Sequence, residues 1–138
     1  MVQELALQIA QKAHAGQVDK AGKDYIFHPM TVASYMNTDI EKAVAYLHDV
    51  LEDTDVTVDE LRNQFPDEIV DAVITLTRKQ KETYSEYIQR IAKSKLAKKV
   101  KVADLLHNLD ITRIKEPTKY DYQRLEKYKK AILYLVSC

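Results

Sequence analysis

The chain has 138 residues with 21 basic and 21 acidic side chains, so its formal net charge at pH 7 is zero. A neutral chain has no overall field that would draw it to a nucleic acid polymer or a membrane surface, so neither is expected as a partner. With 46% hydrophobic residues, two glycines and three prolines, the composition favours an all-α protein, and the length fits a single domain spanning residues 1–138.

Apolar residues recur at intervals of three and four along most of the chain, which predicts helices. The first is expected at 2–15, ended by Gly16, and the second begins near Pro29, a residue suited to a first helical turn. A third is expected from Asp39 or Ile40 to Glu52. The remaining predicted helices are a short one capped by Thr57, then 67–78, 83–94, 96–113 and 119–136, with Thr83 and Thr118 as caps. No repeat or linker interrupts them, so we predict one orthogonal helical bundle.

The N-terminal segment and the cysteine content indicate a cellular location. The segment MVQELALQIAQKAH mixes polar and apolar residues, unlike a signal peptide, and no run approaches the roughly 20 apolar residues that span a bilayer. The one cysteine, Cys138, permits no disulfide within the chain and fits a reducing compartment. We therefore expect a cytoplasmic protein without a membrane anchor.

Charge is distributed unevenly along the chain. Residues 1–77 contain 5 basic and 14 acidic side chains, whereas residues 78–138 contain 16 basic and 7 acidic ones. Two interpretations are open. The charges solvate helix surfaces, or the acidic half holds a cation and the basic half receives an anionic substrate.

The densest group of polar side chains lies in AYLHDVLEDT, residues 45–54. On a continuous helix His48 would lie over Glu52 and Asp49 over Asp53, because side chains four apart share a face. Three carboxylates beside an imidazole are unfavourable unless a cation or protons neutralise them. Imidazole and carboxylate together suit divalent first-row metal ions. The dipeptide alone fits a hydrogen-bonded surface pair as well as a metal site.

Two further segments add to this group. In YIFHPM, His28 stands at the start of a helix, and in KVADLLHNL, Asp104 stands among apolar residues, where an unpaired carboxylate would be costly. We expect His14 and His107 to be structural, supporting the loops of the site through hydrogen bonds. Two roles are open for Asn108: it contacts the substrate, or it supports the residues of the site.

The order H…HD…D resembles the signature of HD-domain metal-dependent phosphohydrolases. More narrowly, AHAGQVDKAGKDYIFHP, AYLHDVLEDTDVT and KVADLLHNL resemble the hydrolase domain of the RelA/SpoT family and its stand-alone small alarmone hydrolases. The resemblance covers about residues 3–113 and implies an all-α domain of the HD type with one bound Mn²⁺. The ligands that it implies are His28, His48, Asp49 and Asp104.

The function that the resemblance implies is metal-dependent hydrolysis of a nucleotide, with (p)ppGpp and its 3′-pyrophosphate as the leading substrate. It also implies that Glu52 and Asp53 serve catalysis, by orienting a water or accepting its proton, and that Asn108 contacts the substrate near its sugar. The phosphates need cationic partners. The candidates are Lys20, Lys23, Arg78, Lys79, Lys81, Lys101 and Arg113.

Around the substrate the sequence departs from the family pattern. Asp19 stands where relatives usually carry a base-stacking arginine, Ala21 where serine is frequent, and Asp110-Ile111 where arginine-threonine is common. Two alternatives therefore stay open: an HD-type nucleotidase or phosphatase acting on another nucleotide, and a non-catalytic nucleotide-binding module. Near the C-terminus, Leu125 and Tyr128 are candidates for a homodimer interface.

Overall fold

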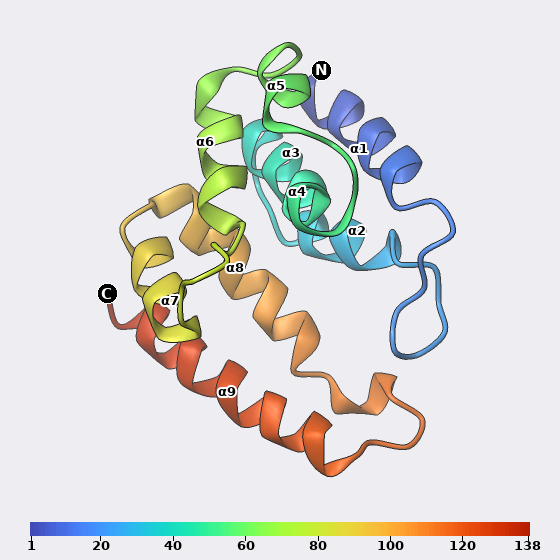
Figure 1. Ribbon diagram of the computed structural model, residues 1–138, viewed down its shortest axis with the longest axis vertical. Coiled ribbons are helices and arrows are strands. Elements are labelled where there is room, and N and C mark those ends of the chain that lie inside the picture. Colours follow the sequence, from blue (N-terminus) through green and yellow to red (C-terminus); the bar gives the residue numbers. More distant parts are fainter.

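The chain folds into a bundle of helices joined by short loops (Figure 1). The structure is a computed structural model that describes residues 1–138, the side chain of Ile111 excepted. Within that part of the chain, β pairing is limited to an isolated antiparallel bridge between Val18 and Asp24. The predicted all-α fold is therefore confirmed. A search of the described helices found none with the length and apolar character needed to cross a membrane.

The observed helices agree with most of the predicted ranges to within a few residues. Their bounds are α1 (Val2–Ala13), α2 (Phe27–Ser34), α3 (Asp39–Leu47), α4 (Val50–Asp53), α5 (Val58–Arg62), α6 (Asp67–Leu76), α7 (Tyr84–Ala92), α8 (Lys95–Asn108), the 3-10 turn η1 (Ile111–Arg113) and α9 (Lys119–Val136). The predicted caps are confirmed, because the side chains of Thr57, Thr83 and Thr118 each accept a backbone N–H from the first turn of their helix.

The continuous helix predicted from residue 39 or 40 to Glu52 is wrong. The chain turns at His48 and Asp49, so that α3 ends at Leu47 and α4 begins at Val50. The Nδ1 atom of His48 lies 2.6 Å from the carbonyl oxygen of Ala45 and bonds to it. This bond uses the acceptor that the N–H of Asp49 would use in a continuing helix, and such competition from a side chain weakens the helix at this point.

The helix predicted at 96–113 is also shorter than expected. Helix α8 ends at Asn108, and residues 111–113 form the separate 3-10 turn η1. Between them, Oδ1 of Asp110 accepts hydrogen bonds from the backbone N–H and the hydroxyl of Thr112. An aspartate that bonds two residues ahead starts a turn, because this bond replaces the helical one.

Helix α3 lies at the centre of the fold and packs against α1, α2, α6 and α8 (Figure 1). Its inward side chains Val44 and Leu47 are completely buried, as are Val73 of α6 and Val100 of α8. Burying one such side chain stabilises a fold by about 1.5–3 kcal/mol. The C-terminal end of α3 is therefore held firmly where α2 and α8 meet it, and this end carries His48.

The loop between α6 and α7 is fixed by Arg90 of α7. Its guanidinium bonds to both carboxylate oxygens of Glu82, at 2.8 and 2.9 Å, and to the carbonyl oxygens of Thr75 and Thr77 at 2.8 and 3.1 Å. A guanidinium that forms two parallel bonds with one carboxylate is a strong and geometrically specific pair. The hydrogen bond from Arg90 lowers the pKa of Glu82 from its ordinary value of 4.5 to about 2.

The pair of Arg90 and Glu82 should affect the stability of the fold at acidic pH. Because the folded protein lowers the pKa of Glu82, the pair stabilises the fold above pH 4.5 and loses its effect as the pH falls toward 2. We expect Glu82→Gln to lower the melting temperature at pH 7 and to flatten its fall between pH 4.5 and 2. Thermal unfolding followed by circular dichroism measures both. The control is Glu126→Gln, since Glu126 forms only an exposed pair with Lys129; equal pH slopes for the native protein and Glu82→Gln would contradict the prediction.

Candidate metal centre and substrate cavity

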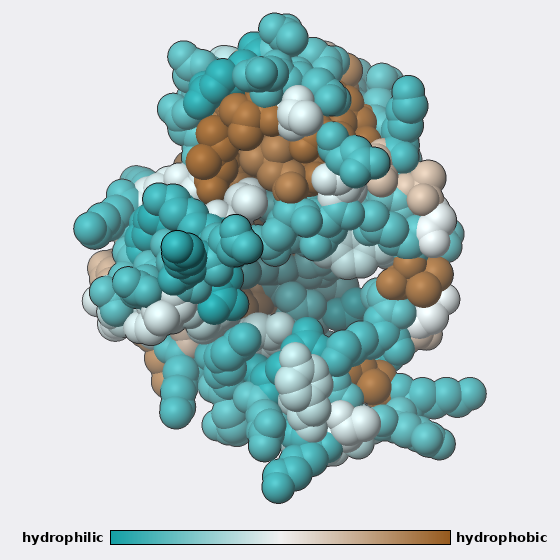
Figure 2. All heavy atoms as spheres, in the orientation of Figure 1, coloured by the Kyte–Doolittle hydropathy of each residue, from teal (hydrophilic) through white to brown (hydrophobic). Residues whose placement is uncertain are grey.

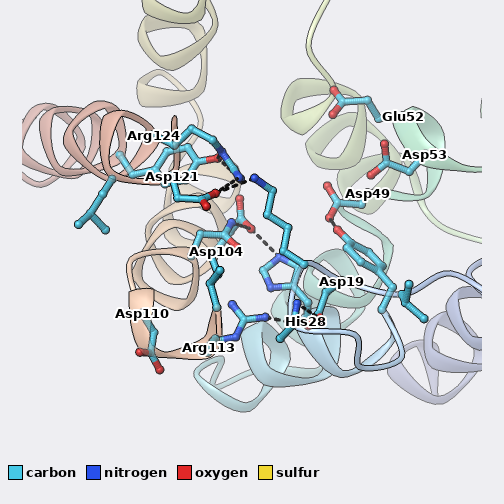
Figure 3. A pocket seen from close by; sticks show the side chains of 18 of the residues that line it. Asp19, His28, Asp49, Glu52, Asp53, Asp104, Asp110, Arg113, Asp121 and Arg124 are labelled. Carbon is cyan, nitrogen blue, oxygen red and sulfur yellow. Dashed lines mark hydrogen bonds and ion pairs between the residues drawn. The ribbon is translucent and has the colours of Figure 1, made fainter. Parts of the chain in front are cut away.

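Three buried side chains from distant parts of the sequence meet at one point. They are His28 from α2, His48 from the end of α3 and Asp104 from α8, and one potential ligand atom from each lies within 4.8 Å of the others. Oδ1 of Asp104 is 2.7 Å from Nε2 of His28 and 3.4 Å from Nε2 of His48. Oδ2 of Asp49 lies 3.0 Å from the same Nε2 of His48. The structure thus brings together all four predicted metal ligands, three of which are labelled in Figure 3.

The hydrogen bonds of His48 show what kind of partner fits this point. Its Nδ1 faces the carbonyl oxygen of Ala45, so Nδ1 carries the hydrogen and, in a neutral ring, Nε2 presents a lone pair. Nε2 is buried and has no hydrogen-bond partner among the described residues, although carboxylate oxygens of Asp49 and Asp104 lie near it. A lone pair and two carboxylate oxygens facing one another require a positive charge between them. This donor set fits a divalent metal ion.

The titration of these groups supports the same conclusion. Burial alone would lower the pKa of His48, but the negative charges of Asp49 and Asp104 raise it well above its ordinary value. Burial likewise opposes ionisation of Asp49, yet the charge of His48 lowers the pKa of this carboxyl to about 2. The cluster therefore favours two ionised carboxylates with a cation beside them. A proton on His48 and a divalent ion compete for that role.

The second oxygen of Asp104 has a partner of its own. Nζ of Lys101 lies 2.9 Å from Oδ2, and both side chains are nearly buried, with exposed fractions of 13% and 6%. Asn108, one turn further along α8, donates to Oδ1 at 3.2 Å. Lys101 was a candidate phosphate ligand, but here its ammonium neutralises Asp104 and leaves Oδ1 directed at the two histidines.

His107 contacts a predicted ligand directly. Its Nδ1 lies 2.7 Å from Nδ1 of His28, and its backbone carbonyl accepts a hydrogen bond of 3.1 Å from Arg113. Burial, assisted by the positive charge of Arg113, lowers the pKa of His107 to about 4. The imidazole of His107 is therefore neutral at pH 7 and contacts His28, and its structural role stays a prediction.

The acidic pair Glu52 and Asp53 lies beside Asp49 at one edge of the site (Figure 3). Oε1 of Glu52 accepts the backbone N–H of Arg78 at 2.8 Å, which ties α4 to the loop after α6. The carboxylate of Asp53 has no hydrogen-bond partner among the described residues, while its backbone carbonyl accepts from Gln17 at 3.0 Å. Burial, together with the charges of Asp49 and Glu52, raises the pKa of Asp53. The carboxylate of Asp53 therefore faces the site without a hydrogen-bond donor from the described residues and with an increased affinity for a proton.

A cavity of about 460 Å³ opens above the cluster. The face in Figure 2 is hollowed across its middle, and hydrophilic residues surround the hollow. Among the predicted substrate-binding residues, Lys20, Lys101, Asn108 and Arg113 line this cavity. Lys23 and Arg78 are exposed and lie outside its lining.

Helix α9 forms a wall of the cavity that the sequence analysis did not predict. Asp121 and Arg124 line it, and Oδ1 of Asp121 lies 2.8 Å from Nζ of Lys20 in the first loop. Leu125 and Tyr128, the candidates for a dimer interface, also line this wall. Arg124 and Tyr128 are four positions apart and hydrogen-bond on one face of the helix, but this spacing does not distinguish a cavity wall from a solvated helix face.

Asp19 anchors the first loop. Its Oδ1 accepts the backbone N–H groups of Ala21 at 2.8 Å and Lys23 at 3.0 Å, and its Oδ2 accepts from Arg113 at 3.1 Å. Burial opposes ionisation of Asp19, but these hydrogen bonds outweigh it and lower the pKa of the carboxyl. The departure at Asp19 thus brings a guanidinium from η1 into the cavity wall. The side chain of Ile111, another departure, lies outside the described residues.

Comparison with known proteins decides the family. The HD domain family matches residues 6–124. The chain belongs to the HD domain family. Curated relatives of this HD domain include a probable GTP pyrophosphokinase of Mycobacterium leprae, which is 36% identical over 83% of this chain and 16% of its own length. They also include two guanosine-3′,5′-bis(diphosphate) 3′-pyrophosphohydrolases. That of Haemophilus influenzae is 37% identical over 73% of this chain and 17% of its own length. That of Borreliella burgdorferi is 32% identical over 75% of this chain and 18% of its own length.

The fold of this HD domain also occurs in a solved structure, that of a metazoan ortholog of SpoT described as hydrolysing ppGpp. The two are 25% identical and superpose with a TM-score of 0.82 over 97% of this chain and 84% of the other. The predicted HD-type fold and the resemblance to RelA/SpoT proteins are therefore confirmed. The chain spans less than a fifth of the length of the curated relatives named above.

Proposed function

We propose that this HD domain is a metal-dependent phosphohydrolase that removes the 3′-pyrophosphate from (p)ppGpp or a closely related nucleotide. The observation that carries the proposal is the meeting of two imidazoles and two carboxylates, with Nε2 of His48 unpartnered in the described part of the chain, beside a cavity whose lining also contains Lys20, Arg113 and Arg124. The names of the Haemophilus and Borreliella relatives and the activity described for the SpoT ortholog support this substrate. We further propose that residues 1–138 form one domain that works in the cytoplasm.

In this proposal four residues hold one Mn²⁺, and a ligand set of imidazole and carboxylate suits this ion as it does other first-row divalent metals. These residues are His28, His48, Asp49 and Asp104. When bound, the ion would supply a Lewis acid that activates water and polarises a phosphoryl oxygen.

Asp53 is the residue that we propose takes the proton from the attacking water. Its carboxylate makes no hydrogen bond to the described residues, lies at the cavity and has a raised pKa, which brings it closer to the pH at which a general base works. Glu52 is held by the N–H of Arg78 and therefore orients α4, and the water in front of it, more than it moves a proton.

Cationic groups on the other walls would bind the phosphates. Arg124 lies across the cavity from Glu52 and Asp53 in Figure 3, and its nearest carboxylate oxygen, on Asp121, is 3.7 Å away. Lys20 is bonded to the same carboxylate and would exchange this partner for a phosphate oxygen. Arg113 and Asn108 complete the lining near the metal ligands. Bound in this way, the cationic side chains would offset the charge of the transition state.

Incubation of the purified protein with Mn²⁺ and a panel of nucleotides tests the function. The panel contains ppGpp, pppGpp, nucleoside monophosphates, nucleoside triphosphates and a plain phosphate ester. We expect pyrophosphate from ppGpp and pppGpp, at rates far above those of an Asp49→Ala control. If no compound in the panel is turned over faster than by that control, the proposal is wrong.

The same panel separates the alternatives. Release of orthophosphate from monophosphates, without pyrophosphate from ppGpp, would identify a nucleotidase. The ion pair between Arg113 and Asp19 favours a nucleotidase over a non-catalytic module. It changes the part of the cavity wall that a nucleobase would contact, and it leaves the proposed metal ligands intact. Tight nucleotide binding without product after metal addition would identify a binding module. The homodimer stays a prediction, because the residues suggested for its interface line the cavity.

A further inference from the structure

We infer that His107 is a positioning residue, which determines the ring nitrogen that His28 offers to a metal ion. The inference rests on the proposed function, because it requires that the cluster binds a divalent ion. It concerns an imidazole outside the proposed ligand set. No catalytic contact is assigned to His107.

The two imidazoles meet edge to edge. Their planes are nearly parallel, at 12°, and their centroids lie 5.0 Å apart, whereas the two Nδ1 atoms are separated by only 2.7 Å. The nitrogen atoms are therefore the nearest points of the rings, as in a hydrogen bond in the common plane. One of these atoms must carry a hydrogen and the other must present a lone pair.

The other nitrogen of His28 decides which atom is the donor once a metal ion binds. Nε2 of His28 points to Oδ1 of Asp104 at 2.7 Å, into the cluster. A histidine ligand binds a metal ion through a lone pair, so its hydrogen must then sit on the other ring nitrogen. His28 must therefore donate from Nδ1, and Nδ1 of His107 must accept.

The two proposed histidine ligands meet this requirement in different ways. For His48 the acceptor is the backbone carbonyl of Ala45, which no substitution removes. For His28 the acceptor is the side chain of His107 on α8. The backbone carbonyl of His107 accepts a hydrogen bond from Arg113, which helps to hold this residue in place. Partners of this kind orient a ligand ring and increase its basicity, and their loss typically weakens metal binding by about 10–100-fold.

Two variants of nearly equal shape test the inference. His107→Asn retains an oxygen acceptor near the position of Nδ1, whereas His107→Leu removes the acceptor. We would measure the affinity for Mn²⁺ by calorimetry and the visible absorption spectrum of the Co²⁺-loaded protein, both without nucleotide. The melting temperature of the metal-free protein shows whether each variant is folded.

We expect His107→Leu to bind Mn²⁺ about 10–100-fold more weakly than the native protein and to change the Co²⁺ spectrum. His107→Asn should stay within a few-fold of native affinity and retain the spectrum. Equal affinities in all three proteins, or equal losses in the two variants, would overturn the inference and leave the proposed function intact. A native protein that binds neither Mn²⁺ nor Co²⁺ would overturn both. If neither variant melts cooperatively, the role of His107 is structural, and the inference is wrong.

Discussion

Replacing Asp49 with asparagine is expected to reduce the proposed phosphohydrolase activity by on the order of 10³-fold, because losing a proposed metal ligand would remove several kcal/mol of transition-state stabilisation. The carboxylate of Asp49 lies against Nε2 of His48 and also accepts a hydrogen bond from the hydroxyl of Tyr25. An asparagine keeps the shape and can still accept from Tyr25 through its amide oxygen. It loses the negative charge that attracts a cation.

The stability of the metal-free variant separates a lost ligand from a damaged fold. Asp49 stands close to the carboxylates of Glu52 and Asp53, but the charge of His48 outweighs their repulsion, because it lowers the pKa of the Asp49 carboxyl to about 2. We therefore expect metal-free Asp49→Asn to unfold cooperatively at a modestly lower melting temperature than the native protein at pH 7, while calorimetry shows weaker Mn²⁺ binding. Asp59→Asn, an exposed change on α5, is the matched control. Activity within tenfold of native in Asp49→Asn would remove Asp49 from the proposed ligand set.

The sequence predicts the helices well because their signals are local. Capping threonines and apolar intervals of three to four residues are complete within one segment, which explains why α7 and α9 begin where expected. The break at His48 was missed for the same reason. Val50 and Leu51 continue the apolar pattern through the turn, and only the bond from the imidazole to Ala45 shows that the helix has ended.

The candidate site is predictable only in part. Each of the proposed ligands stands in a segment whose composition makes a polar residue conspicuous, as with Asp104 among the apolar residues of α8. The wall from α9 carries no such signal, since Arg124 and Asp121 look like the solvated face of an amphipathic helix. Their role emerges when the fold brings Asp121 to Lys20, which is 101 positions away in the sequence.

The uneven charge distribution also gains a spatial meaning. The acidic half of the chain contributes Asp49, Glu52 and Asp53 to one side of the cavity, and the basic half contributes Arg113 and Arg124 to other parts of its wall (Figure 3). This geometry favours the second interpretation of the charge, in which one half holds a cation and the other receives an anion.

Replacing Lys101 with methionine is expected to destabilise the metal-free protein by about 3 kcal/mol, because removing one partner of a buried ion pair leaves the other charge uncompensated. Lys101 and Asp104 are both nearly buried and lie 2.9 Å apart. The expected loss is at the lower end of the usual range, since His28 and His48 also face this carboxylate and His48 holds a proton readily.

A divalent ion should reverse much of this loss. Without Lys101, Asp104 offers more uncompensated negative charge to the cluster, so saturating Mn²⁺ is expected to raise the melting temperature of Lys101→Met by more than it raises that of the native protein. Lys99→Met is the matched control, because Lys99 lies on the same helix and pairs with Glu41. The side chain of Lys99 is 39% exposed, and an ion pair with such an exposed partner contributes about 1 kcal/mol or less to stability. An equal or smaller metal-induced rise in Lys101→Met would show that the charge of Asp104 does not hold the ion.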